Sequence, residues 1–289
     1  MAKILKTISM LSPAKLNLFL HIVGRHPTTG YHHLETLFQL VNLCDEMTFS
    51  TTAEPTLSIE GMQDVPFEQN LIFQAAKMLF EKFKVQTGVH IKIIKRIPMG
   101  GGLGGGSSNA ATTLLALNYL WALNQSIATL AEIGLSLGAD VPVFIQGRTA
   151  WAKGVGELIE PVDLPKSNFI IIFPRIAVST KLIFEHPHLK RDTLPIPLDI
   201  TQLQQTRNDC EPIATNLFPE IQEVLAFLQA FGSARLTGTG SCCFLSVETL
   251  EKGEKILQYM PHRWIGFLVE SIPVSPSVIT LQALQQNKP

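Results

Sequence analysis

A glycine-rich stretch at residues 98–109, PMGGGLGGGSSN, constrains this chain more than any other part of it. Six of the seven residues 100–106 are glycine, and only Leu103 carries a side chain there. Glycine tolerates positive φ and lets backbone N–H groups approach a ligand closely. Such a stretch is either a flexible linker or part of a binding site, and the segments on each side of it decide between the two.

The flanking segments favour a binding site. Before the stretch, apolar residues alternate along residues 89–94, which predicts a half-buried strand. After it, Ser107 and Ser108 are favourable N-cap residues for a helix predicted by the apolar run at residues 110–117. At the junction of a glycine loop and a helix, unpaired N–H groups and the positive end of the helix dipole converge on an anion. The sequence therefore predicts a phosphate-binding loop.

Two common glycine motifs do not explain this loop. The P-loop spacing is present, but Ser107 stands where that motif requires lysine. Gly100, Gly102 and Gly105 match G-x-G-x-x-G, but a dinucleotide site also needs an acidic residue about 20 positions later, at the end of a second strand. That region of the chain is still helical in pattern. We therefore expect neither a Walker-type nor a Rossmann-type site.

Composition narrows the classes of function. Hydrophobic residues make up 46% of the 289 residues and charged residues 16%, which indicates a large apolar interior. The net charge of −1 disfavours a nucleic acid partner. No stretch approaches the ~18 apolar residues of a membrane span, and the N-terminus does not resemble a secretion signal. The cysteine spacing fits neither a redox pair nor a zinc site, so we expect reduced thiols in a cytoplasmic protein.

Apolar periodicity and turn residues predict the other elements. Strands are expected at residues 12–23, 36–43, 47–51, 169–173 and 265–269, and helices at residues 70–83, 108–121, 126–137, 211–217, 220–231 and 250–260. A change in composition at residues 161–167 predicts a boundary between a first domain, 1–164, and a second domain, 165–289. The order of elements after this boundary suits a ferredoxin-like split βαβ layer.

Two short segments before the glycine stretch carry polar residues with alternative interpretations. Lys15 and Asn17 share one face of the strand predicted at residues 12–23, about 6.5–7 Å apart. They are either solvated residues of an open face or part of a site. Tyr31 and His32 follow a loop rich in turn formers. They either lie on the surface or offer a ring face and a hydrogen-bonding edge to a ligand.

Asp140 has two interpretations as well. It stands between Gly138, which ends a predicted helix, and a Val141–Pro142 step that disfavours α geometry. Its neighbours are apolar, so it either caps the next turn or acts as a catalytic group. Phosphoryl transfer needs stabilised charge, an in-line acceptor and a group that takes the acceptor's proton. Asp140 could take that proton and Lys15 could assist it, but their spacing of 125 positions does not show that they meet.

The glycine stretch resembles the signature of the GHMP superfamily, which comprises galactokinase, homoserine kinase, mevalonate kinase and phosphomevalonate kinase. Within it, the chain is more closely similar to one family, the kinases that phosphorylate 4-diphosphocytidyl-2-C-methyl-D-erythritol in the non-mevalonate isoprenoid pathway. Four segments carry this closer resemblance, namely PAKLNLFL at 13–20, GYH at 30–32, LGADVPVF at 137–144 and LTGTGS at 236–241. With the glycine stretch they span most of the chain.

The resemblance implies an α+β fold, in which an amino-terminal domain like ribosomal protein S5 domain 2 and a ferredoxin-like carboxy-terminal domain enclose the active site. It implies Lys15 and Asp140 as the catalytic pair. It also implies that Asn17, Tyr31, His32 and Phe184 bind the cytidine substrate, whose tertiary 2-hydroxyl receives the phosphate. The residues expected to bind ATP are Pro98, Met99, Gly100, Gly101, Gly102, Leu103, Gly104, Gly105, Gly106, Ser107 and Ser108.

ATP and Mg²⁺ are the cofactors that this resemblance implies. No protein ligand for the metal is predicted, because phosphates and water often hold Mg²⁺. We expect a small-molecule substrate, no nucleic acid or membrane partner, and a monomer or weak homodimer. The alternatives are a superfamily kinase for mevalonate or homoserine, a nucleotide-binding protein without catalysis, and an RNA-binding module. Tyr31 and His32 argue against the first, the intact Lys15 and Asp140 against the second, and the net charge against the third.

Overall fold

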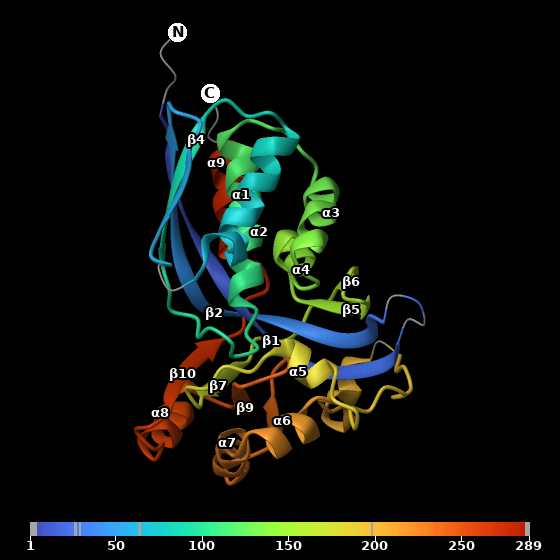
Figure 1. Ribbon diagram of the computed structural model, residues 1–289. Helices are drawn as coiled ribbons and strands as arrows, with labels where there is room; N and C mark the ends of the chain where they lie inside the picture. Colours follow the sequence, from blue (N-terminus) through green and yellow to red (C-terminus); the bar gives the residue numbers. More distant parts are fainter. Residues whose placement is uncertain (1–4, 26–27, 29, 63–64, 198, 287–289) are drawn as a thin grey trace.

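Two β-sheets lie one above the other in the computed structural model, which describes residues 5–25, 28, 30–62, 65–197 and 199–286 (Figure 1). The strands are β1 (Thr7–Arg25), β2 (His32–Thr52), β3 (Leu57–Glu60), β4 (Gly88–Ile94), β5 (Ala150–Gly154), β6 (Leu158–Pro161), β7 (Asn168–Phe173), β8 (Ala234–Leu236), β9 (Cys243–Val247) and β10 (Ile265–Glu270). The first sheet has the order β3-β4-β2-β5-β6, with β1 also paired to β2. The second has the order β10-β7-β9-β8.

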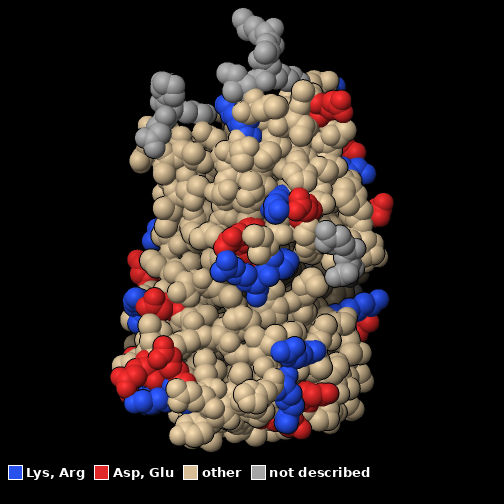
Figure 2. Space-filling view, turned by 90° about the vertical axis from the view of Figure 1, so that its left-hand side faces the viewer, with Lys and Arg blue, Asp and Glu red and all other residues tan. Residues whose placement is uncertain are grey.

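Helices cover one side of the first sheet (Figure 1). Along the described chain the helices are α1 (Leu71–Lys82), α2 (Gly105–Leu120), α3 (Ile127–Leu137), α4 (Val141–Gln146), α5 (Thr180–Phe184), α6 (Glu211–Leu217), α7 (Pro219–Gln229), α8 (Leu250–Gln258) and α9 (Pro276–Gln286). Of these, α5 to α8 belong to the second half of the chain and do not cover the first sheet. The other side is open, and there hydroxyls pair across β1 and β2, as Ser9 does with Thr48 at 3.1 Å. Figure 2, which looks onto this side, shows small groups of both charge signs and no broad field of one sign.

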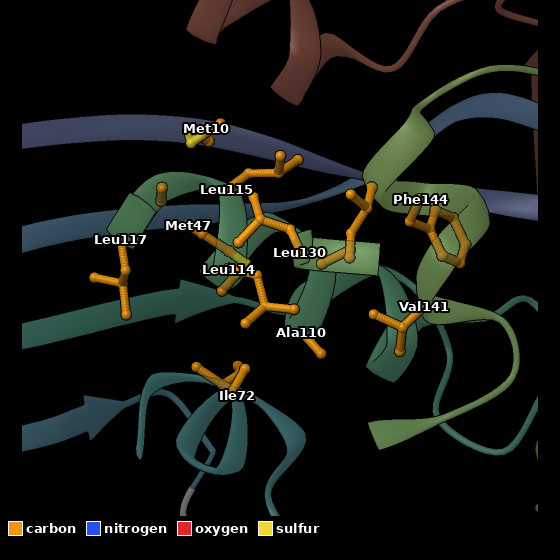
Figure 3. Packing of buried hydrophobic residues seen from close by; sticks show 14 of the residues in the cluster. Met10, Met47, Ile72, Ala110, Leu114, Leu115, Leu117, Leu130, Val141 and Phe144 are labelled. Atoms are coloured by element: carbon orange, nitrogen blue, oxygen red, sulfur yellow. The ribbon is translucent and has the colours of Figure 1, made fainter. Parts of the chain in front are cut away.

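The first core forms around α2 (Figure 3). Leu114 and Leu115 of this helix are buried with Ile72 of α1 and Met47 of β2. Because α2 is covered on nearly all sides, its buried residues are not confined to one face and its sequence lacks an amphipathic period. Burial of this helix fixes the position of its N-terminus, where the glycine loop ends.

The structure of strand β2 differs from the prediction for this region. Two strands were expected, at 36–43 and 47–51, yet β2 runs without interruption through Cys44, Asp45 and Glu46. Opposite it, the pairing register shifts between Pro13 and Ala14 of β1, which is the mark of a β-bulge. The Asp45 carboxylate is buried and satisfied by the partners described below, so the strand continues through the segment between the two expected strands.

Helices were expected from residues 70, 126, 211, 220 and 250, and α1, α3, α6, α7 and α8 begin within one residue of these positions, whereas the N-cap expected at Ser107 or Ser108 is wrong. Asn70 and Ser126 cap α1 and α3, accepting hydrogen bonds from Ile72 N and Thr129 N. Ser107 and Ser108 do not cap α2, because that helix already begins at Gly105 behind a left-handed Gly104. The short helices α4 and α5 and the terminal α9 were not predicted. Helix α4 forms despite its proline, which occupies the first turn, where no intrahelical N–H bond is needed.

The two sheets separate near the predicted boundary, since β6 ends at Pro161 and β7 begins at Asn168. The division into 1–164 and 165–289 itself stays a prediction. Helix α9 returns to the first half of the chain, where its Leu281 joins the core around α2. Within the part of the chain that the structure describes, no helix is long and apolar enough to cross a membrane.

Candidate active site

A cavity of about 590 Å³ brings together residues from both halves of the chain. Asn17 of β1, Asp140 before α4 and Phe184 at the end of α5 line it, as do Gly238 and Thr239 from the second half. All the predicted ATP-binding residues from Pro98 to Ser107 also line it. Residues predicted from separate segments therefore share one space.

Hydrogen bonds hold the glycine loop between β1 and the turn at residues 237–241. Lys15 N donates to Leu103 O at 3.0 Å, and Cys242 N donates to Gly101 O at 3.0 Å. Gly102 has a φ of +75°, and a Cβ on it would lie 2.3 Å from Thr237 O. Only glycine allows this conformation and this approach together. The loop is therefore packed against defined neighbours and is not a flexible linker.

The first turn of α2 faces the cavity. Gly105, Gly106 and Ser107 line it, and a Cβ on Gly106 would meet only Leu71, at 3.5 Å. The unpaired N–H groups of a helix start lie at such a position, ready for an anion. Ser108 differs from the prediction in its placement, because its side chain is fully buried and shares a 2.7 Å hydrogen bond with Ser12 Oγ.

Lys95 lines the same cavity and was missed by sequence reasoning. Its Nζ is bonded to the Asp45 carboxylate and lies 3.1 Å from Asn109 Oδ1. Asp45 is fully buried and also accepts hydrogen bonds from the backbone N–H groups of Arg96 and Ile97, at 2.7 and 2.9 Å. No spacing pattern distinguishes Lys95 from a surface lysine after β4; its position follows from the buried carboxylate.

Lys15 and Asp140 form an ion pair, with Nζ 3.5 Å from Oδ2. Lys15 is 3% exposed, whereas Asp140 is 35% exposed. The Lys15 ammonium also donates to Gly102 O at 2.9 Å and to Asn17 Oδ1. Burial lowers the pKa of Lys15, and the charge of Asp140 opposes that shift. Asp140 occupies the N-cap position of α4 but makes no side-chain cap bond, so its carboxylate serves Lys15 and the cavity.

Asn17 is held by three elements. Its Nδ2 donates to Thr36 Oγ1 of β2 at 2.9 Å, and its backbone N donates to Thr237 Oγ1 at 3.0 Å. With the amide nitrogen engaged, Oδ1 faces the Lys15 ammonium. The buried face of β1, read in the sequence as open to solvent or part of a site, is thus part of the cavity wall.

The predicted cytosine-binding residues differ in whether they line the cavity. Phe184 lines the cavity, and its ring centroid lies 5.1 Å from that of His32 at the start of β2. Tyr31 and His32 are not among the described residues that line the cavity, and Tyr31 is 68% exposed. Residues 26, 27 and 29 of the preceding loop lie outside the described residues.

The wall of the cavity combines one carboxylate with several donors. Asp140 is the one acidic residue among the described residues that line it, and Lys15 and Lys95 are the two lysines there. No group of three histidine, cysteine or acidic side chains suited to a metal occurs in the part of the chain that the structure describes. An anion at the glycine loop and an alcohol beside Asp140 would lie next to each other, as phosphoryl transfer requires.

Comparison with known proteins agrees with this arrangement. The model of the GHMP kinases N terminal domain matches residues 70–148, and that of the GHMP kinases C terminal domain matches residues 189–266. A protein of Pseudoalteromonas translucida named 4-diphosphocytidyl-2-C-methyl-D-erythritol kinase is 47% identical over 96% of this chain and 98% of its own length. One of the same name from Alcanivorax borkumensis is 48% identical, over 93% and 92%.

Solved structures agree as well. The crystal structure of a 4-(cytidine 5'-diphospho)-2C-methyl-D-erythritol kinase superposes with a TM-score of 0.79 at 33% identity, over 91% of this chain and 99% of that one. Mevalonate kinase of Methanococcus jannaschii shares the fold, with a TM-score of 0.67 at 16% identity over 94% and 100%. The predicted α+β fold of a GHMP kinase is confirmed. The chain belongs to the GHMP kinase superfamily and, within it, to the family of 4-diphosphocytidyl-2-C-methyl-D-erythritol kinases.

Proposed function

We propose that this chain transfers the γ-phosphoryl group of ATP to the 2-hydroxyl of 4-diphosphocytidyl-2-C-methyl-D-erythritol, in the non-mevalonate isoprenoid pathway. Membership of a kinase family implies ATP as the donor. The observation that carries the proposal is the Lys15–Asp140 pair, 3.5 Å apart beside a glycine loop in one cavity. The names of the relatives with 47–48% identity support the acceptor.

Each part of the site has a role in this reaction. Residues 98–107 and the start of α2 bind the phosphates of ATP through backbone N–H groups. The 2-hydroxyl oxygen of the acceptor attacks the γ-phosphorus, the bond from that phosphorus to the bridging oxygen breaks, and ADP leaves. Asp140 accepts the hydroxyl proton. Lys15, fixed by Asn17 and Gly102, stabilises the negative charge that develops on the attacking oxygen.

Mg²⁺ fits this cavity as a companion of ATP. Mg²⁺ is usually bound by one or two carboxylates together with substrate phosphates and water. Asp140, the single carboxylate among the described lining residues, is engaged by Lys15 and faces the acceptor, so the phosphates of ATP and water would hold the ion without a protein ligand. When bound, the ion neutralises charge on the phosphates.

We also propose that Tyr31, His32 and Phe184 bind the cytosine, and that the protein is a cytoplasmic monomer or weak homodimer.

The Asp140→Asn substitution tests the role of the carboxylate. We expect kcat to fall by at least ~10²-fold, because the amide cannot accept the hydroxyl proton, while the affinity for ATP stays within about twofold. Asp163→Asn is the matched control, since Asp163 is an exposed surface aspartate 3.3 Å from Arg148. Steady-state rates with the cytidine acceptor and titration with ATP give the two quantities. A kcat equal to that of the Asp163 control would remove Asp140 from the mechanism.

A further inference from the structure

Arg191 links the start of β2 to the end of α5. Its Nε donates a hydrogen bond to His32 Nε2 at 2.9 Å, and its Nη2 donates to the carbonyl oxygens of Phe184 and His186, both at 2.9 Å. Its Nη1 donates to Leu189 O at 3.0 Å. The guanidinium is planar and its donors have a fixed arrangement, so these four bonds define one geometry. None of the four acceptors is a carboxylate.

The bond from Arg191 also sets the protonation of His32. Arginine has no acceptor and stays charged, so His32 Nε2 must accept the hydrogen bond. A neutral imidazole that accepts at Nε2 carries its hydrogen on Nδ1. Burial first, and then the charges of Arg191 and Arg25, lower the pKa of His32. The ring is therefore held neutral, with a hydrogen-bond donor at Nδ1.

The same guanidinium joins the His32 ring to the backbone of Phe184. The His32 and Phe184 rings are 5.1 Å apart between centroids and inclined by 36°. Arg191 bonds the side chain of the first and the carbonyl of the second. Phe184 lines the cavity. A flat heteroaromatic ligand is recognised by ring faces together with a few directed hydrogen bonds, and both depend on this arrangement.

We infer that Arg191 is a positioning residue for the nucleobase of the acceptor, which holds the His32 and Phe184 rings in place and keeps His32 a donor at Nδ1. The inference rests on the proposed function, in which these rings bind cytosine. Cytosine has hydrogen-bond acceptors at N3 and O2, whereas N3 of uracil carries a hydrogen. A fixed donor directed at N3 therefore favours the cytidine acceptor over its uridine counterpart.

Steady-state kinetics of Arg191→Met and Arg191→Lys test this inference. We expect Arg191→Met to raise KM for the cytidine acceptor about tenfold, with kcat and KM for ATP within about twofold of the wild-type values. The ratio of kcat/KM for the cytidine acceptor to kcat/KM for the uridine counterpart should fall. Arg191→Lys keeps the charge but not the planar fork, so its acceptor KM rises as well. Arg263→Met, which removes an exposed arginine paired with Glu223, serves as the control. An acceptor KM at the control value in both variants, or full activity in Arg191→Lys, would overturn the inference.

The tautomer of His32 gives a second readout, which needs no variant to fold. In the wild-type protein labelled with ¹⁵N-histidine, we expect Nδ1 of His32 to carry the hydrogen and Nε2 to carry none at neutral pH. The opposite tautomer, or a charged ring, would contradict the Arg191–His32 bond. If the wild-type enzyme does not phosphorylate the cytidine acceptor, the proposed function fails, and the ¹⁵N spectrum still decides on that bond. If it does and both variants share its KM, only the inference on Arg191 fails.

Discussion

At the scale of single residues, Lys15 and Asp140, the proposed catalytic pair, differ in burial. Lys15 is enclosed and its charge is held by Asp140, Asn17 and the carbonyl of Gly102, while Asp140 keeps about a third of its surface exposed to the cavity. A buried ammonium is costly unless hydrogen bonds and an opposite charge compensate it. The carboxylate that compensates Lys15 is thus the group left open to an acceptor.

The titration of Lys15 follows from this arrangement. Because burial lowers its pKa and Asp140 opposes the shift, we expect Lys15 to lose its proton at lower pH than a surface lysine. Asp140→Asn removes the opposing charge, so the pKa of Lys15 should fall further. Activity that needs the charged ammonium is present at low pH and is lost as pH rises through this lowered pKa. NMR titration of ¹³C-lysine in the wild-type protein and in Asp140→Asn measures the shift.

A Lys15 pKa that is not below the ordinary value of a lysine, or that does not fall in Asp140→Asn, would contradict this account of the pair. The meeting of Lys15 and Asp140 was not predictable from spacing, because β1 and the segment before α4 approach only through the tertiary fold. Sequence similarity suggested the pair, and the structure supplies the contact. Arg191 carried no signal at all, since its acceptors are mostly backbone carbonyls.

At the scale of elements, the glycine loop requires glycine for different reasons at different positions. Gly102→Ala places a Cβ 2.3 Å from Thr237 O at a φ of +75°. We expect it to lower the free energy of unfolding by at least ~2 kcal/mol, from left-handed strain and the displaced carbonyl. Gly106→Ala meets only Leu71 at 3.5 Å, inside α2, and should raise that free energy by about 0.5–1 kcal/mol.

The two alanine variants form a matched pair. Because Gly106 faces the cavity, its Cβ takes space from the phosphates, and we expect KM for ATP to rise about tenfold although the fold is not weakened. Denaturant unfolding and ATP kinetics on both variants measure stability and binding separately. Equal loss of stability in the two variants would show that the loop is only a spacer.

Asp45 joins β2 to the start of the glycine loop. Its fully buried carboxylate binds Lys95, Asn109 and the backbone N–H groups of Arg96 and Ile97. We expect Asp45→Ala to lower the free energy of unfolding by about 3–5 kcal/mol, because it leaves the partly buried Lys95 charge and three other donors without their acceptor. Glu46→Ala is the control, since that neighbour pairs with Arg96 at the surface. A loss in Asp45→Ala no larger than in the control would contradict this role.

Local sequence signals explain why some elements were predicted, and long-range contacts or a misread signal explain why others were missed. Asn70 and the apolar period behind it defined α1 closely, because the cap and the buried face agree. The break expected in β2 was wrong because the partly buried Lys95 stabilises the Asp45 carboxylate from 50 positions away. Helix α4 was missed because Pro142 was read as a helix breaker rather than as a residue of its first turn. Terminal α9 owes its place to the core around α2.

At the scale of the whole molecule, the cavity depends on both sheets. The first half contributes Lys15, Asp140 and the glycine loop, and the second contributes Phe184 and the turn at 237–241, which hydrogen-bonds to the loop. The donor phosphates and the acceptor hydroxyl are thus positioned by parts of the chain that meet only in the folded protein. A change in composition predicted two halves and the family resemblance implied a site between them, whereas the residues of the cavity wall come together only through tertiary contacts.

The central claim concerns the acceptor, and a comparison of acceptors tests it most directly. Purified protein is given ATP and Mg²⁺ with 4-diphosphocytidyl-2-C-methyl-D-erythritol, mevalonate or homoserine in parallel, and ADP release is followed together with the ³¹P spectrum of the product. We predict turnover with the cytidine acceptor alone and a new phosphate monoester on its 2-hydroxyl. Turnover with mevalonate or homoserine and none with the cytidine compound would contradict the account.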